Sequence, residues 1–214
     1  MNKTLLIISS IAMCIICSCN TQNDSPTTNQ EAAPQEMTLK EALQLRHSVR
    51  NFSDKALTDE QVMDLLWAAN GISHGTKRTA PSGVNAQDIS LYVCSANGVS
   101  IYQAQDSTLQ KVTDQDIRPI FRGRNQFIDT APITILLISD LSKFGEPRPN
   151  NHNWEMALMD AGCVSQNISL WCTATGLATV CCAPPMPNAG IQQALGLDSQ
   201  HISLIYHPIG YEAE

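Results

Sequence analysis

Residues 132–139 read Pro-Ile-Thr-Ile-Leu-Leu-Ile-Ser, and this stretch decides the fold of the 214-residue chain. A short and nearly continuous apolar run predicts a β-strand that is covered on both of its faces. We therefore expect a strand at the centre of a sheet, with packing layers on either side of it.

Further strands are expected both before and after this central segment. Residues 89–94 alternate aliphatic side chains with others, and Asn97-Gly98 is a strong signal for a tight hairpin turn. Residues 99–103 would then pair back on the preceding strand. Shorter strands are expected at 109–112, 177–180 and 202–206.

Helices are indicated by capping signals and by apolar residues at helical spacing. Thr38 with Glu41, and Thr58 with Gln61, match the capping box at the starts of two helices. The first helix is expected to end near Leu45, where the chain becomes extended. The second carries an apolar stripe, which predicts one buried face. The stripe consists of Val62, Leu65, Leu66 and Ala69, and Gly71 ends the helix.

The longest expected helix, residues 153–176, is rich in small side chains. A face of small residues allows close backbone approach to another helix, either in the core or across a two-fold axis. A short helix at 188–195 would end at Gly196. Because helices and hairpins are mixed around a central strand, the predicted fold class is α+β. The small residues are Ala157, Ala161, Gly162, Ser165, Ser169 and Thr173.

The N-terminal residues have the features of an export signal. Lys3 precedes an apolar run at 5–16, which is shorter than the roughly 20 residues that span a bilayer. The next residues, ending at Cys19, read Ile-Cys-Ser-Cys and resemble a bacterial lipobox. The resemblance implies that a lipoprotein signal peptide, residues 1–18, is removed and that the Cys19 thiol is lipidated. An ordinary cleaved secretory signal and an uncleaved anchor are the alternatives.

Residues 19–36 are expected to form a flexible tether behind this lipid anchor. The stretch 20–36 has no large apolar residue, so it cannot bury enough surface to offset the cost of ordering. The folded domain would be residues 37–214, exported to the periplasmic or cell-surface side, with membrane contact only through the lipid. The formal net charge of −7 and the lack of any basic run argue against nucleic-acid binding.

The cysteines beyond the signal show no metal-binding or disulfide pattern. There is no Cys-x-x-Cys pair and no zinc-ligand spacing, so no metal is expected. Most are expected to be small buried hydrophobic side chains. Cys181 and Cys182 are adjacent and could form a redox pair, but a vicinal disulfide is strained, which favours two reduced thiols. The five are Cys94, Cys163, Cys172, Cys181 and Cys182.

Residues 46–52, Arg-His-Ser-Val-Arg-Asn-Phe, directly follow the first expected helix. In an extended segment the alternate side chains Arg46, Ser48 and Arg50 point the same way and can converge on one anion. Guanidinium groups bind phosphate oxygens well because their charge-assisted hydrogen bonds can be bidentate. Taken alone the pattern is weak, because surface arginines are mostly solvated.

Four segments in this order resemble the FMN-dependent nitroreductase family, and the resemblance covers residues 38–211. The wording at 66–71 and 101–102 is most similar to the branch that includes thiazoline/oxazole dehydrogenases. The four segments are 46–52 (RHSVRNF), 80–87 (APSGVNAQ), 130–132 (TAP) with the strand that follows it, and 176–180 (GLATV) with 206–211 (YHPIGY).

The resemblance implies a nitroreductase-like α+β sandwich with a mostly antiparallel central sheet, flanked by helices. It also implies a domain-interlocked homodimer with two FMN sites at the subunit interface. Carried over by position, Arg46, Ser48 and Arg50 would hold the FMN phosphate and ribityl chain. His47 would contribute through its backbone, and the alternative for its imidazole is a packed or surface histidine.

The other end of the flavin would be held by residues of a second loop. By the same resemblance, Pro81, Ser82, Gly83 and Asn85 would come from the partner subunit and pack on the isoalloxazine ring. Asn85 can both donate and accept hydrogen bonds at a flavin edge, or it is a turn asparagine. Gln126 would lie near the flavin, with a solvated loop residue as the alternative.

Two positions depart from the pattern of the family. Backbone amides around Cys181 and Cys182 would face the flavin N5 side, but an arginine common in this branch is missing there. No Lys or Arg follows Tyr211 either, whereas many family members have a basic C-terminal tail. Phosphate binding should therefore depend unusually heavily on Arg46 and Arg50.

The resemblance implies an FMN-dependent oxidoreductase in which the flavin, not a side chain, carries the chemistry. A small-molecule donor, NAD(P)H or an exported substrate, would pass a hydride by a ping-pong mechanism to a quinone, flavin or nitro-type acceptor. The alternative is a non-catalytic flavin- or ligand-binding surface lipoprotein, which the missing cations favour.

Overall fold

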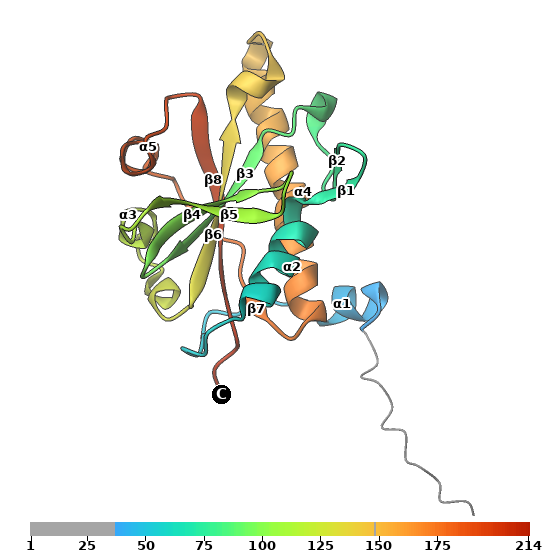
Figure 1. Cartoon of the computed structure of the whole chain (residues 1–214), viewed down its shortest axis with the longest axis vertical. Helices are drawn as coiled ribbons and strands as arrows, with labels where there is room; N and C mark the ends of the chain where they lie inside the picture. The colour runs from blue at the N-terminus through green and yellow to red at the C-terminus, as the bar shows by residue number, and fades with distance from the viewer. Residues whose placement is uncertain (1–36, 148) are drawn as a thin grey trace, which may run out of the picture. The chain divides into compact units, whose positions relative to one another are not determined.

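We describe the fold from a computed structural model that covers residues 37–147 and 149–214. The expected signal peptide, residues 1–18, and the tether with Cys19, residues 19–36, lie outside the described residues. The described chain forms one six-stranded sheet with helices on both faces (Figure 1). The predicted α+β class is therefore confirmed.

All neighbouring strands of the sheet are antiparallel, in the order β5-β4-β3-β6-β8-β7. A separate antiparallel pair, β1 and β2, follows the second helix. The central position expected for residues 132–139 is confirmed, because β6 lies between β3 and β8. The strands are β1 (Ile72–His74), β2 (Lys77–Arg78), β3 (Ile89–Ser95), β4 (Gly98–Gln103), β5 (Thr108–Thr113), β6 (Ile133–Asp140), β7 (Ala178–Thr179) and β8 (His201–Gly210).

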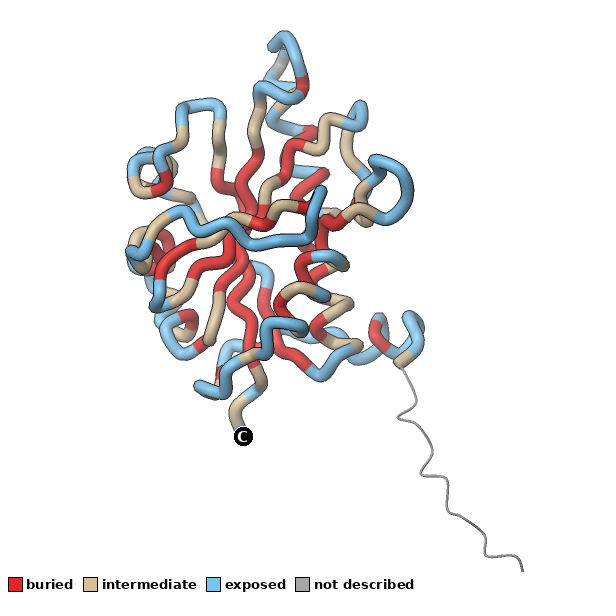
Figure 2. Tube along the Cα trace, in the orientation of Figure 1, coloured by how far each residue is buried: buried red, intermediate tan, exposed pale blue. Residues whose placement is uncertain are grey.

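The side chains of β6 alternate between two hydrophobic cores. Ile135 and Leu137 belong to one core, and Leu136 and Ile138 belong to the other. All four are fully buried, and the middle of the sheet is the buried part of the fold in Figure 2. A strand buried on both faces needs apolar residues at successive positions, which is why its sequence lacks the usual alternation.

Two helix layers supply these cores. α2 and α4 cover the face of Ile135, and the shorter α3 and α5 cover the opposite face. None of the helices in the described part of the chain is long and apolar enough to cross a membrane. The helices are α1 (Leu39–Leu45), α2 (Asp59–Asn70), α3 (Arg118–Phe121), α4 (His152–Ala174) and α5 (Asn188–Leu195), with short 3-10 turns η1 (Gly83–Asn85), η2 (Gln126–Asp129), η3 (Leu141–Phe144) and η4 (Pro149–Asn151).

Both predicted capping boxes are present, at Thr38 with Glu41 and at Thr58 with Gln61. Each threonine side chain accepts a backbone N–H while the acidic or amide side chain returns a bond, which satisfies otherwise unpaired helix donors. The stripe of α2 is buried as expected. On α4 the small-residue face packs mainly into the core of this chain, where four small residues are buried. They are Ala157, Ala161, Ser165 and Ser169.

The hairpin between β3 and β4 differs in detail from the prediction. Ala96 and Asn97 form the turn, and Gly98 already pairs with Ser95 at the start of β4. Gly98 has φ +109, and a Cβ there would lie 2.1 Å from the carbonyl oxygen of Thr113. The glycine is therefore required by the close approach of β5, where the β4–β5 ladder shifts register.

The last strand is longer than expected, because β8 continues through Pro208 to Gly210. Tyr206 exchanges two backbone hydrogen bonds with Cys182 on the neighbouring segment, at 3.0 and 2.9 Å. In an antiparallel ladder the next residue to donate on that side is Pro208, which has no N–H. Pro208 therefore interrupts the ladder between β7 and the Cys182 bridge without ending the strand.

A buried histidine joins three elements at this edge of the sheet. His207 of β8 is fully buried, with Nε2 2.8 Å from Ser165 Oγ on α4 and Nδ1 3.1 Å from Thr179 Oγ1 on β7. Burial lowers the pKa of His207 to about 3, so the imidazole is neutral at physiological pH. The neutral ring keeps both hydroxyl contacts and fixes β7 against the helix.

The His207→Gln variant should lose about 1–3 kcal/mol of unfolding free energy at pH 7, because two buried hydroxyls lose their partner. This penalty should shrink by about 1.4 kcal/mol per pH unit as the pH falls below 6.5, the ordinary histidine pKa. The reason is that only the wild type must exclude a proton that its unfolded histidine takes up. Urea titrations of both proteins between pH 4 and 8 measure this difference; parallel pH profiles would contradict it.

Candidate functional site

The arginine run follows α1 as an extended segment that is fixed to the sheet by its buried residues. The N–H of Val49 donates to the carbonyl of Thr179 in β7 at 3.0 Å, and Phe52 forms a β-bridge with Glu212. Val49 and Phe52 are both buried. Three polar side chains of the run, two before Val49 and one after it, are exposed. These are Arg46, Ser48 and Arg50.

Among the residues that the structure describes, neither Arg46 nor Arg50 forms an ion pair. Two exposed guanidinium groups and a hydroxyl thus stand free on a backbone that is anchored at Val49 and Phe52. This arrangement fits an anionic group such as phosphate, because bidentate donors are available on a fixed segment. All three side chains are exposed, and their convergence on one anion stays a prediction.

A pocket of about 360 Å³ lies beside this run. The His47 imidazole at its rim contacts the carbonyl of Leu45 at 2.9 Å and lies 3.6 Å from the Glu212 carboxylate. His47 is exposed, in line with the surface alternative for its side chain. The walls come from the run, the end of α4, β7 and the C-terminus. They include Val49, Thr173, Gly176, Ala178, Thr179 and Glu212.

The Cys181-Cys182 step lies close to the same run. Both thiols are free, Cys181 is exposed and Cys182 is buried. Burial raises the pKa of the Cys182 thiol to about 11, and the nearby positive charge of Arg50 only partly opposes this. Cys182 therefore stays protonated at neutral pH, which makes it a packing group and not an anionic nucleophile.

A polar contact beneath this step was not predicted from the sequence. The side-chain amide of Asn125 donates to the hydroxyl of Tyr206 at 2.7 Å, and the phenol also contacts the Cys182 thiol. Gln126 follows Asn125 at the start of η2 and is exposed. The two bonded residues are 81 positions apart, so no local pattern could reveal the contact.

The second predicted loop docks on α4. The backbone N–H of Gly83 in η1 donates to both carboxylate oxygens of Asp160, at 2.9 Å each. Val84, Asn85 and Gln87 have positive φ of 49°, 59° and 51°, which is rare for residues other than glycine. Pro81 and Asn85 are exposed, and Ser82 uses its hydroxyl to accept the N–H of Gln87 at 2.8 Å.

One chain does not bring the two predicted halves of the site together. The loop docks at Asp160, while the pocket beside the arginine run reaches α4 at Thr173. At 1.5 Å rise per residue these positions are about 20 Å apart along the helix. Figure 1 shows η1, in green, beside the first half of α4, with α1 and β7 at its other end.

Comparisons with known proteins agree with this architecture. The nitroreductase family model matches residues 43–211. A protein of Methanocaldococcus jannaschii that is named as a nitroreductase is 25% identical over 191 residues, which cover 84% of this chain and 94% of that protein.

Two solved structures extend the likeness. A Ralstonia eutropha JMP134 protein described as a nitroreductase has a TM-score of 0.77 at 26% identity, covering 85% of this chain and 86% of that one. A chain of the Escherichia coli microcin synthetase McbBCD complex has a TM-score of 0.67 at 18% identity, covering 100% and 79%, and shows likeness of fold alone. The chain therefore belongs to the nitroreductase family, whose members are oxidoreductases that generally bind FMN.

Proposed function

We propose that this protein is an FMN-dependent oxidoreductase that acts as a homodimer. The observation that carries the proposal is the anchored run whose Arg46, Ser48 and Arg50 side chains are exposed without ion-pair partners, beside a pocket of about 360 Å³. These side chains would hold the phosphate and ribityl chain. A phosphate bound there would neutralise two cations that no described carboxylate neutralises.

FMN, when bound, would accept a hydride from a donor and pass electrons to a quinone, flavin or nitro-type acceptor in a ping-pong sequence. The side chains of Asn85 and Gln126 are exposed amides, able to donate hydrogen bonds to the pyrimidine edge of the ring. Donors at that edge would favour negative charge on the reduced ring. The side chains would bind and orient FMN, and the proposed reaction needs no side chain that exchanges electrons or forms a covalent bond.

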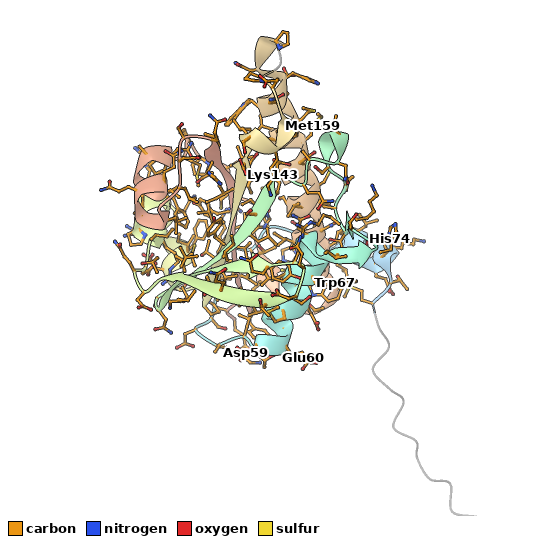
Figure 3. All side chains as sticks on the ribbon, turned by 45° about the horizontal axis from the view of Figure 1, so that its top comes forward. Asp59, Glu60, Trp67, His74, Lys143 and Met159 are labelled. Carbon is orange, nitrogen blue, oxygen red and sulfur yellow. The ribbon has the colours of Figure 1, made fainter. Side chains whose placement is uncertain are left out.

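The homodimer is part of the proposal because it would unite the two halves of the site. The loop at 81–85 would reach the arginine run of the other chain across a two-fold axis. Apolar side chains on the outside of the helices support a partner on this face. Trp67 on α2 is 44% exposed, Leu39 on α1 is 66% exposed and Met159 on α4 is 59% exposed. Figure 3 labels Trp67 and Met159.

The donor follows from the location that we propose. If Cys19 is lipidated and the domain is exported, NAD(P)H, a cytoplasmic donor, would be out of reach. We therefore favour oxidation of an exported small molecule, or electron delivery by a membrane partner. The similarity of 66–71 and 101–102 to thiazoline/oxazole dehydrogenases is consistent with an oxidation of this kind.

A second candidate is a surface lipoprotein that binds a flavin or another ligand without turnover. The pocket beside the arginine run is lined by Glu212, and Cys181 and Cys182 stand where the branch commonly has a cation. From the run itself, His47 and Val49 line this pocket, and neither Arg46 nor Arg50 does. This charge balance favours weak cofactor binding, which would suit a binding protein better than an enzyme.

Purified protein should be yellow, or become yellow on addition of FMN. Dithionite or NADPH should bleach the visible flavin bands, and a quinone should restore them, because the bound flavin would exchange electrons with small molecules. Visible spectroscopy measures each step. A flavin that is bound but not reoxidised by any acceptor would favour the binding protein, and a colourless protein that ignores FMN would contradict the oxidoreductase.

The Arg50→Ala variant should raise the FMN dissociation constant by about tenfold or more, because a charge-assisted bond to phosphate is lost. Quenching of flavin fluorescence on binding measures this constant. Lys111→Ala is the matched control, since it removes the same charge from β5 at the opposite edge of the sheet. Equal effects of the two substitutions would contradict the phosphate assignment.

Mixed dimers test whether the site is shared between chains. Arg50→Ala should lose flavin, and Asn85→Asp should lose turnover, because its carboxylate would oppose negative charge on the reduced ring. Co-expression of the two variants should restore about a quarter of the native sites by random pairing. Quinone reduction per chain measures this recovery. A mixture as inactive as its parents would show that the two residues serve the same chain.

A further inference from the structure

Two buried carboxyl groups meet beneath the loop that carries Asn85. Asp88, directly before β3, is fully buried, and Asp160 of α4 is 5% exposed. The Ser139 hydroxyl donates to Asp88 Oδ2 at 2.5 Å, and the Gly83 N–H donates to both oxygens of Asp160 at 2.9 Å. The pair thus links β6, β3, α4 and η1.

One oxygen of this pair has no donor in the described residues. Asp88 Oδ1 is buried and accepts no hydrogen bond, yet the Asp160 carboxyl is its neighbour. Two buried ionised carboxylates in contact repel each other, whereas a single shared proton turns the same contact into a hydrogen bond. The unpartnered oxygen is therefore explained if the pair holds one proton.

No cation of the surrounding elements neutralises the pair. Lys143 of η3 reaches the carbonyl of Gln87 at 3.3 Å, and Arg78 of β2 binds the side chain of Gln87 at 3.0 Å. Asp140 of β6 follows Ser139 and adds a further carboxylate. That carboxylate lies 4.0 Å from the His201 imidazole of β8. The charge of the neighbouring Asp160 disfavours ionisation of Asp88.

The loop held by Asp160 is strained. Val84, Asn85 and Gln87 adopt positive φ, a conformation that costs energy and persists only where the surroundings fix it. The contacts that fix this loop are the Gly83–Asp160 bonds, the Ser82–Gln87 bond and the Gln87 side-chain contacts. Loosening Asp160 would therefore let the backbone around Asn85 relax.

We propose that Asp88 and Asp160 share one proton and together act as a pH-dependent positioning pair for the loop of residues 82–87. The consequence for the flavin rests on the proposed function, because Asn85 would then be oriented by this pair. The effect on the loop itself does not depend on flavin binding.

The direction of the pH effect follows from the burial of the pair. Burial, together with the neighbouring Asp160, raises the pKa of Asp88 to about 7 from its ordinary 3.8. With the loop of residues 82–87 docked on Asp160, the pair therefore binds a proton. The pair releases this proton when the loop undocks or the chain unfolds. Stability from the shared proton is complete below pH 3.8 and is lost as the pH rises to about 7, above which no further loss occurs.

Amide hydrogen exchange of Gly83, followed by NMR between pH 5 and 9 and corrected for intrinsic rates, tests the pair. In the wild type the protection factor should fall by about tenfold per pH unit from 5 to 7 and then level off. Asp88→Asn should abolish this slope, because the amide N–H replaces the shared proton at every pH. Asp160→Asn should also abolish the slope, because the amide N–H introduced at position 160 would then donate to Asp88 at every pH.

The control is Asp140→Asn, which neutralises a neighbouring carboxylate and should keep the slope of the wild type. A wild-type slope retained in both Asp88→Asn and Asp160→Asn would overturn the proposal, and so would a flat wild-type profile. The measurement is made on the protein without flavin. It therefore succeeds or fails independently of FMN titration, which tests the proposed function.

Discussion

The burial of β6 on both faces is the constraint on which the rest of the structure depends. A strand that is apolar at successive positions cannot leave either face to water, so the sheet must carry two layers of helices. One layer contains α4, whose length spans the sheet, and the other contains the short α3 and α5. The residues assigned to the site, in the segments 46–52 and 81–87, lie outside the central strands and the helices that cover them.

The length of α4 then determines how the site is distributed. One end of the helix supports the pocket beside the arginine run, and the docking point of the Asn85 loop lies about 20 Å away along its axis. The charged groups of the two regions also differ in their exposure to water. Arg46 and Arg50 are solvated cations on an anchored strand, whereas Asp88 and Asp160 are acids removed from water.

Much of the fold could be predicted because its signals are local. Capping boxes, an apolar stripe and the run at 132–139 are each read within a few residues, and the structure contains all of them. The contacts of Asn125 with Tyr206 and of Asp88 with Asp160 could not be predicted in this way. Each joins residues far apart in sequence that only the folded sheet brings together.

Other details of the fold could not be predicted from local sequence, for physical reasons that the structure shows. The last strand is expected at 202–206 but continues to Gly210, because Pro208 removes one hydrogen bond on one side only. The positive φ of Val84 and Gln87 has no sequence signature, because neither residue favours that region of backbone space.

The exposed strand β5 ends the sheet, and an open strand edge is a template for the strand of another molecule. Lys111 lies within this edge, and the register shift at Val99 and Ser100 distorts the ladder beside it. Both features make continuous backbone pairing with a second sheet unfavourable. Growth of the protein into edge-to-edge fibres is thereby discouraged, and the helical surfaces are left as the faces through which chains can associate.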